Sequence, residues 1–578
     1  MPQIHPSDHP IKTALKRSQR TLIGLAAFSF ILNLLMLTGP LYMLQVYDRV
    51  LSSQSVPTLV ALTILILVLF GTVGLVDWVR RSLLSIVAAR IEDRLADPVL
   101  KAALENSIQD PGQSAQRPLQ DLSLVRRFVA SPSTAALFDL PWSPLFFAAL
   151  FMLHWSFGLW ALFGCAVLVT MTVLNRTLTK TDIEDAQADG RAAQIRASEF
   201  IRYADTARAL GMEQALQTRW RSTLDAADTA MRTSESKLAF FTANTKSSRL
   251  FLQSAILGLG AWLVILGQST AGAMIAASIL MGRAIAPIEQ IVGQWSSFAT
   301  LQSALKNLSE AVSKTAVRSE TMPLPAITGR LQLEGVSAGP PNTDKPVLKN
   351  LSFDMAPGDV LGIIGPSAAG KTTLAKVIGG IWRPKLGTVR IDGADIETWT
   401  RDALGPQIGY LSQQVDLFGG TVKENISRFN PDAAPDAVIA AAKNANCHDL
   451  ILSLPAGYDT EIGQSGAYLS AGQRQRVGLA RALYGDPNLV ILDEPNANLD
   501  SPGEEALQNA IIGLKARKAT IIIIAHRPNA IQHCQRLLVL KDGEIKLLGP
   551  RDEVLSQLSS TQAKTGVTPI RSGGGGHG

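Results

Sequence analysis

The chain has 578 residues, of which 47% are hydrophobic and only 18% are charged, and its formal net charge is +6. A net charge this small does not indicate a nucleic-acid partner. Because the apolar residues are concentrated in the first half, the composition argues against one enlarged soluble core and indicates membrane spans. The three cysteines, Cys165, Cys447 and Cys534, lie far apart without metal-ligand spacing, which fits a reducing compartment.

Four stretches of the first half contain no Asp, Glu, Lys or Arg: 21–47, 57–76, 140–175 and 250–282. The first two are each long enough for one membrane span, and Asp48 and Arg49 are expected to end the first. The last two are too long for a single span, so we expect them to turn back near His154 and at 267–272. The sequence therefore predicts six spans.

Long polar connections separate these spans at 78–134 and 176–249. Both are rich in helix formers, with apolar residues at helical spacing, and they predict helices that project out of the membrane. We expect bends near 117–127 and 204–211, where such helices would dock onto another domain.

Two polar residues near the third span have competing interpretations. Asp139 precedes Pro141 and Pro144, and prolines suit the first turn of a helix, so an interfacial helix start is favoured for Asp139 over a functional ionisable group. His154 has no partner in the sequence that would suggest metal binding or catalysis. We therefore interpret His154 as a structural residue of the turn.

The second half contains a phosphate-binding motif, G-x-x-x-x-G-K-[ST], between an apolar run at 360–364 and a helical run at 374–378. Its backbone N–H groups and the helix N-terminus would bind phosphate oxygens, Lys371 would reach the outer phosphates and Thr372 would ligate Mg²⁺. An incidental glycine-rich turn is the alternative, which this context disfavours. The expected nucleotide-binding residues are Gly365, Pro366, Ser367, Ala368, Ala369, Gly370, Lys371, Thr372 and Thr373.

Two further apolar runs end in polar side chains, as buried strands do at the ligand-binding edge of a parallel sheet. The run at 489–492 is followed by Asp493, a candidate Mg²⁺ ligand, and by Glu494, a candidate to polarise the attacking water. The run at 521–524 leads to His526, which would sense the γ-phosphate.

A second anion-binding helix start is predicted before the helical run at 474–483. Its residues are Leu469, Ser470, Ala471, Gly472 and Gln473. One chain thus contains two phosphate-facing helix starts but only one phosphate-binding loop.

In their order along the chain, the loop at 365–373, Gln413, the segment 469–473, Asp493-Glu494-Pro495, Asp500 and His526 resemble the motifs of an ABC-transporter nucleotide-binding domain. This resemblance implies a dimer in which the loop of one subunit and the 469–473 segment of the other enclose each ATP. It further implies that Gln413 contacts Mg²⁺ and the membrane domain, that Ser470 and Gly472 close on the γ-phosphate, that Asp500 lies at the dimer contact, and that His526 is the switch histidine.

The sequence departs from this pattern at two places. Ala471 stands where the family usually has glycine, and its methyl group would hinder close approach of the backbone to phosphate. The stretch 337–341 offers no aromatic residue to stack on adenine.

A change from helical to strand-like composition near Pro323 and Pro325 predicts the domain boundary. We expect a cytosolic N-terminal segment at 1–20, a membrane domain at 21–320, an ATPase domain at 321–558 and a disordered tail at 559–578. The predicted fold is an all-α, six-span ABC exporter domain fused to a cytosolic α/β P-loop ATPase domain. Six spans put both termini on one side, which is the cytosol because the ATP site faces it, in agreement with the basic segment at 12–20.

The stretches 40–51 and 138–146 are similar to segments of bacterial type I secretion ATPases. About 20 residues before the first span are too few for the N-terminal peptidase domain of some relatives. The resemblance therefore implies the protease- or lipase-exporting branch. It further implies a homodimer in the bacterial inner membrane, a cargo with a C-terminal signal, a periplasmic adaptor (membrane fusion protein) and an outer-membrane channel.

Two other functions are compatible with these motifs. The first is an ABC exporter of lipids or small hydrophobic molecules. The second is a membrane receptor or channel that ATP only regulates. A soluble ATPase that acts on DNA is disfavoured, because such an enzyme would not need six apolar spans.

Overall fold

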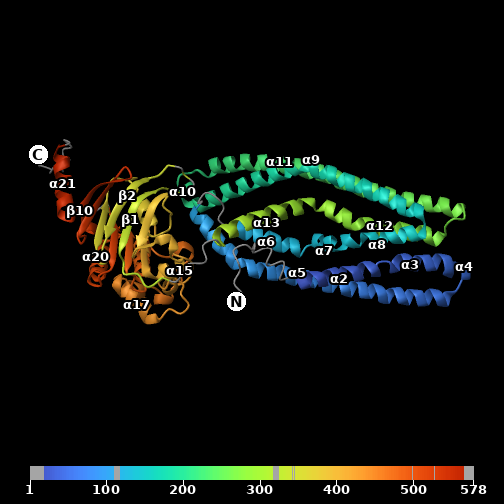
Figure 1. Ribbon diagram of the computed structural model, residues 1–578, viewed down its shortest axis with the longest axis horizontal. Helices are drawn as coiled ribbons and strands as arrows, with labels where there is room; N and C mark the ends of the chain where they lie inside the picture. The colour runs from blue at the N-terminus through green and yellow to red at the C-terminus, as the bar shows by residue number, and fades with distance from the viewer. Residues whose placement is uncertain are drawn as a thin grey trace. The chain divides into compact units, whose positions relative to one another are not determined.

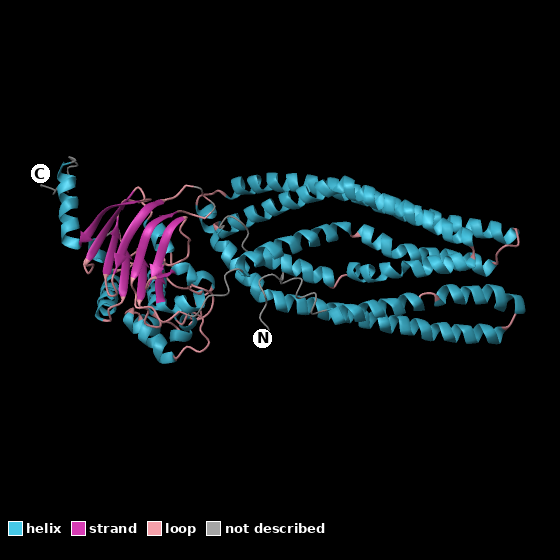
Figure 2. Ribbon diagram, viewed as in Figure 1, coloured by secondary structure: helices cyan, strands magenta, loops and turns pink. Residues whose placement is uncertain are grey.

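The structure, a computed structural model, describes residues 19–109, 117–316, 324–341, 343, 345–497, 499–525 and 528–564 (Figure 1). The chain separates into two compact units. Within the described residues, the first unit contains helices alone, whereas the second contains all the strands (Figure 2).

The helices of the first unit alternate between short segments and very long ones. They are α2 (Gln19–Leu35), α3 (Thr38–Gln45), the π-helix η1 (Val46–Val50), α4 (Leu51–Ser53), α5 (Val56–Gln109), α6 (Arg117–Val129), α7 (Pro132–Asp139), the 3₁₀ turn η2 (Leu140–Trp142), α8 (Ser143–Leu153), α9 (Trp155–Arg202), α10 (Ala204–Ala209), α11 (Glu213–Ile265), α12 (Ala271–Gly293) and α13 (Trp295–Ala316).

Six helical segments in the described part of the chain are long and apolar enough to cross a membrane, as predicted. They are Thr21–Ser53, Val56–Gln109, Pro132–Leu153, Trp155–Thr179, Glu213–Ile265 and Ala271–Ile291. Both expected turns are confirmed, because the chain reverses at His154 and between Ile265 and Ala271. The His154 Nδ1 atom accepts a hydrogen bond from the Ser156 backbone N–H (3.2 Å), which caps α9 and agrees with a structural role.

The predicted bends are partly confirmed. The short helix α10 interrupts the chain at Ala204–Ala209, between α9 and α11. Residues 117–127, in contrast, lie within the regular helix α6. The connection between α5 and α6 falls at 110–116, outside the described residues.

Asp48 and Arg49, which are expected to end the first span, do not end the helical segment. The chain continues through η1 to Ser53. Asp48 is accommodated because its Oδ2 accepts from the Thr270 hydroxyl (2.6 Å) and its Oδ1 from the Gly272 N–H (2.9 Å). Its negative charge therefore lies at the first turn of α12, where the helix dipole stabilises an anion.

Asp139 lies where two helices meet. It is the last residue of α7 and also the N-cap residue of η2, whose first turn contains Pro141, although its side chain does not cap η2. Its Oδ1 instead accepts from Arg80 Nη1 (2.7 Å) and from Asn33 Nδ2 (3.0 Å). Arg80, only 6% exposed, also contacts Asp77 through Nη2 (2.7 Å). These polar contacts link α2, α5 and α7.

We expect Arg80→Met to lower the free energy of unfolding by about 3 kcal/mol or more, because it leaves the Asp139 carboxylate without its cation. Thermal unfolding of the detergent-solubilised protein measures this loss. The matched control is Arg81→Met, since Arg81 also contacts Asp77 (2.8 Å) but its side chain is 61% exposed. The control should change the stability by about 1 kcal/mol or less. Equal losses in both variants would contradict the prediction.

The second unit is built on two sheets. The antiparallel sheet has the order β2 (Leu348–Met355), β1 (Leu331–Ala338), β4 (Leu386–Ile391) and β5 (Ala394–Asp395). The larger sheet has the order β10 (Glu544–Pro550), β9 (Arg536–Lys541), β3 (Val360–Ile364), β8 (Thr520–Ile524), β7 (Leu489–Asp493) and β6 (Ile408–Leu411). All neighbours in the larger sheet are parallel except β10 and β9.

Helices cover both faces of the larger sheet. They are α14 (Lys371–Ile378), α15 (Arg401–Leu404), α16 (Val422–Ile426), α17 (Pro435–Asn444), α18 (His448–Leu452), α19 (Ala471–Leu483), α20 (Ser501–Ala516) and α21 (Arg551–Lys564). Helix α21 continues past Ser559, where we expected disorder to begin; residues 565–578 lie outside the described residues.

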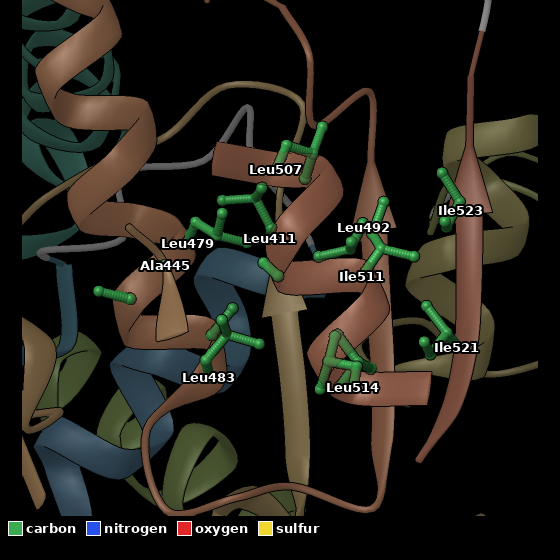
Figure 3. Packing of buried hydrophobic residues seen from close by; sticks show 14 of the residues in the cluster. Leu411, Ala445, Leu479, Leu483, Leu492, Leu507, Ile511, Leu514, Ile521 and Ile523 are labelled. Atoms are coloured by element: carbon green, nitrogen blue, oxygen red, sulfur yellow. The ribbon is translucent and has the colours of Figure 1, made fainter. Parts of the chain in front are cut away.

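Burial of both faces explains why the sequence of strand β8 is apolar without interruption. Ile521 and Ile523 point to one face, where they join a cluster that includes residues of α19 and α20 (Figure 3). Ile522 and Ile524 point to the other face and join a cluster with α14 and the antiparallel sheet. A strand buried on both faces has no polar alternation, which is the pattern of a central parallel strand.

Candidate active site

Strand register brings most of the predicted site residues to one edge of the larger sheet. Ile524 is paired with Ile363 of β3 on one side and with Asp493 of β7 on the other. Leu411, the last residue of β6, is paired with Leu492. The phosphate-binding loop, the Asp493-Glu494 pair and Gln413 therefore all follow the carboxyl ends of adjacent parallel strands, where ligands bind in α/β sheets.

The phosphate-binding loop has a backbone that restricts its residue types. Gly370 has φ +102°, and a Cβ added there would lie 2.7 Å from the Leu348 side chain. A Cβ on Gly365 would lie 2.0 Å from the Leu540 carbonyl oxygen of β9. Ala368 has φ +63°, which is uncommon for a residue other than glycine. The loop is therefore held tightly against β2 and β9, while its outer residues Pro366, Ser367 and Ala368 remain exposed.

Lys371 opens α14 and is 5% exposed. Its Nζ donates to the carbonyl oxygens of Gly365 and Pro366, both at 2.9 Å. Burial lowers the pKa of Lys371, although the nearby Glu494 and Asp493 carboxylates act in the opposite direction. The ammonium group thus lies between its own loop and the two acidic residues, within the site where phosphates would bind. Ala369 is buried, and Thr372 and Thr373 occupy the first turn of α14, as expected for a loop that opens a helix.

Asp493 is fully buried, and neither carboxylate oxygen forms a hydrogen bond with any residue that the structure describes. Burial raises the pKa of Asp493; the Thr372 hydroxyl, which lies close without the geometry of a full hydrogen bond, lowers it. A buried carboxylate without hydrogen bonds is costly unless a cation binds it. Asp493 and Thr372 therefore fit a Mg²⁺ site, since Mg²⁺ prefers carboxylate and hydroxyl oxygens and retains several waters.

We expect Asp493→Asn to stabilise the second unit in the absence of Mg²⁺, by roughly 1 kcal/mol, because it removes the cost of burying a charge. The folded-state pKa of Asp493 is raised, so its ionisation destabilises the native state as pH rises through that pKa, and this pH dependence should vanish in the variant. Melting temperatures of the full chain without nucleotide, measured as a series from below pH 3.8, the ordinary pKa of the carboxyl, up to pH 8, test both statements. A lower melting temperature at pH 8 than in the parent protein would contradict them.

Glu494 is held in an unusual backbone conformation. Its φ is +50°, and its N–H donates to the Ile524 carbonyl oxygen of β8 (3.0 Å). Such a conformation costs free energy and is most often retained where it serves a function. The chain therefore turns sharply after Asp493, and the half-buried Glu494 stays near Lys371 at the edge of the sheet.

The predicted helix start at 469–473 begins α19. The Ser470 Oγ accepts from the Gln473 N–H (3.3 Å), and the Gln473 Oε1 accepts from the Ser470 N–H (2.8 Å), which is a capping box. Leu469 is buried, whereas Ser470 and Ala471 are exposed, so the methyl group of Ala471 is accommodated. Within the described residues, no hydrogen bond or ion pair links this segment to the phosphate-binding loop of the same chain.

Asp500 has a local role that the sequence did not indicate. Its Oδ1 accepts from the Gly503 N–H (3.0 Å), which caps α20, and from Arg476 Nη2 of α19 (2.6 Å). The Arg476 guanidinium lowers the pKa of Asp500. Arg476 was missed because an isolated arginine in a helix carries no sequence signal, and only the fold places it beside Asp500.

The structure says less about the surroundings of two predicted site residues, Gln413 and His526. Gln413 follows β6 and is exposed. His526 comes two residues after β8 and lies outside the described residues. Tyr410 of β6 was not predicted to belong to the site. Burial, with a further contribution from Asp493, raises the pKa of Tyr410 to about 12. Its phenol therefore stays protonated near Asp493.

Comparisons with known proteins agree with this architecture. The sequence profile "ABC transporter transmembrane region" matches residues 22–287, and the profile "ABC transporter" matches residues 348–497. The chain is 41% identical over 554 residues to the type I secretion system ATP-binding protein PrsD of Rhizobium meliloti (strain 1021), covering 95% of this chain and 94% of PrsD.

More distant relatives share the same two-part organisation. The cyclolysin secretion/processing ATP-binding protein CyaB of Bordetella pertussis is 30% identical, over 93% of this chain and 76% of CyaB. The alpha-hemolysin translocation ATP-binding protein HlyB of Escherichia coli is 28% identical, over 95% of this chain and 78% of HlyB. A solved structure of a bacterial Atm1-family ABC exporter with ATP bound has a TM-score of 0.80 at 22% identity, covering 96% of this chain and 99% of that chain, which shows the shared fold.

Proposed function

Because this chain belongs to the ABC transporter family, we propose that it hydrolyses ATP to export unfolded polypeptides across the bacterial inner membrane, as the motor of a type I secretion system. The observation that carries the proposal is the site at the edge of the larger sheet, which lies in one chain with six membrane-spanning segments. The names of PrsD, CyaB and HlyB support the export of proteins over the export of lipids or small hydrophobic molecules.

The site contains the functional groups that phosphoryl transfer to water requires. The backbone of the loop at 365–373 and the Lys371 ammonium bind the ATP phosphates. Thr372 and Asp493 hold Mg²⁺, with Gln413 as a further contact, and bound Mg²⁺ neutralises charge on the phosphate oxygens. Glu494 orients the attacking water and accepts its proton, and His526 contacts the γ-phosphate.

The active unit is a homodimer. This part of the proposal is supported by the 469–473 segment, whose exposed helix start has no hydrogen bond to its own phosphate-binding loop within the described residues. In the dimer, Ser470 and Gly472 of one subunit complete the ATP site of the other, and Asp500 lies near the contact. Each ATP site then closes only when two subunits meet.

The domain bounds, the membrane orientation and the partners that we propose follow from membership of the ABC transporter family. The membrane domain covers 21–320 after a cytosolic segment at 1–20, the ATPase domain covers 321–558, and both termini face the cytosol. The partners are a cargo protein with a C-terminal signal, a periplasmic adaptor, an outer-membrane channel and the lipid bilayer, without a nucleic acid.

Comparison of the proteins in the medium of a deletion strain and its parent tests the proposal. We expect one or more proteins to disappear from the medium of the deletion strain and to return when the gene is restored. An unchanged set of secreted proteins together with altered export of lipids or small hydrophobic molecules would instead favour the alternative ABC exporter.

A further inference from the structure

Helix α19 contains a buried amide on a face that is otherwise apolar. Gln475 is only 3% exposed. It lies four residues before Leu479 and eight before Leu483, so it shares the helix face that packs into the apolar cluster of Figure 3. An amide buried in such a position is costly unless it forms a hydrogen bond. The partner of Gln475 therefore indicates why this position is polar.

That partner is the residue that follows Glu494. The Gln475 Nε2 donates to the Pro495 carbonyl oxygen (3.0 Å), and both residues are buried. Because proline has no N–H, its carbonyl is the one backbone group through which a hydrogen bond can hold Pro495. Gln475 thus fixes the chain directly after Glu494 to helix α19.

Glu494 depends on such contacts because of its backbone conformation. Its φ of +50° is costly, and a conformation of this kind persists only where the surrounding contacts fix it. The Glu494 N–H donates to the Ile524 carbonyl oxygen (3.0 Å), which ties the turn to β8. The Glu494 carbonyl oxygen accepts from the Ala497 N–H (3.0 Å), which closes the turn on itself. The bond from Gln475 adds a contact from a helix that covers the sheet.

We propose that Gln475 is a positioning residue for ATP hydrolysis. Its hydrogen bond to the Pro495 carbonyl oxygen holds the turn so that the Glu494 carboxylate faces the attacking water. This inference rests on the proposed role of Glu494 as the base. A base acts only within hydrogen-bonding reach of the water, and a misplacement of about 1 Å can cost about 10²-fold in rate.

Gln475→Met tests the proposal, because methionine has nearly the same length and shape as glutamine but no hydrogen-bond donor. We expect kcat for ATP hydrolysis by the purified full-length protein to fall by about 10–100-fold. The KM for ATP should stay close to the parent value, since the phosphate-binding loop is unchanged. Gln475→Leu, a second variant without a donor, should give the same result and covers the case in which the methionine variant does not fold.

The matched control is Gln407→Met, the same change at a half-buried glutamine of the same unit. The Gln407 Nε2 donates to the Ala403 carbonyl oxygen (2.9 Å). Gln407 immediately precedes β6, so it lies at the opposite end of that strand from the candidate site. We expect this variant to retain the kcat of the parent protein.

A double variant separates positioning of Glu494 from a general structural effect. If Gln475 acts through the Glu494 carboxylate, Gln475→Met should cause no further loss once Glu494→Gln has removed that carboxylate. Single-turnover release of phosphate measures the residual rates of the two proteins. Thermal unfolding of each variant shows whether it is folded under the assay conditions.

Three results would overturn the inference while the role of Glu494 stands. They are the parent kcat in a folded Gln475 variant, an equal loss in Gln407→Met, and a loss in the double variant as large as in Gln475→Met alone. Failure of both Gln475 variants to fold would likewise assign Gln475 to stability instead. If Glu494→Gln by itself hydrolyses ATP at the parent rate, the proposed role of Glu494 fails, and the inference about Gln475 fails with it.

Discussion

Glu494→Gln is expected to lower ATP turnover of the purified protein by about 10²–10⁴-fold, the usual contribution of a general base. Glutamine has nearly the same shape as glutamate but cannot accept the proton of the attacking water. The parts that bind the phosphates and Mg²⁺ are unchanged, so the variant should still bind Mg-ATP. Phosphate release and equilibrium binding of a fluorescent ATP analogue measure the two properties separately.

The matched control for this variant is Glu505→Gln, the same change at an exposed position of α20. Its turnover should equal that of the parent protein. If Glu494→Gln hydrolyses ATP at the parent rate, Glu494 is not the base. If instead the variant loses ATP turnover but supports export at the parent rate, the proposal of an ATP-driven motor fails in favour of a channel or receptor that ATP only regulates.

Lys371→Ala is expected to reduce ATP turnover by about 10²–10³-fold or more, the effect of removing one preorganised donor to a charge that develops in the transition state. Affinity for ATP should fall as well, because Lys371 binds the phosphates before and during the reaction. The variant also loses two hydrogen bonds to Gly365 and Pro366, which costs about 1–3 kcal/mol of stability. The fold should therefore persist, as circular dichroism would show.

Lys376→Ala provides the control for charge and for position on α14. Lys376 lies on the same helix, and its Nζ is 4.4 Å from the centre of the Trp382 ring. We expect this variant to retain most of its turnover. Equal losses at Lys371 and Lys376 would indicate a general effect of positive charge near the acidic pair rather than a direct contact of Lys371 with phosphate.

Local patterns in the sequence were sufficient to predict many helices and strands of the fold. The run at 360–364 was expected as a strand before a phosphate-binding loop, and β3 has these bounds, with α14 starting at Lys371. The run at 489–492 likewise forms β7. Such predictions succeed because a strand buried on both faces, or a helix in a bilayer, needs a continuous apolar run that can be read directly from neighbouring residues.

Polar contacts between residues that are distant along the chain could not be predicted. The Thr270 hydroxyl and the Gly272 N–H, more than 200 positions away, donate to the Asp48 carboxylate. The Asp139 carboxylate pairs with Arg80 of another helix. Neither partner is marked by a local pattern.

By itself, the sequence determined the six apolar spans, the phosphate-binding loop and the acidic residues that follow β7, because each depends on a short run of residues. Only the tertiary structure decided that β3, β8, β7 and β6 are neighbours, that Asp493 is buried without a hydrogen bond among the described residues, and that Arg476 lies beside Asp500. The physical reason is that burial, electrostatic pairing and strand order depend on segments that folding brings together from far along the chain.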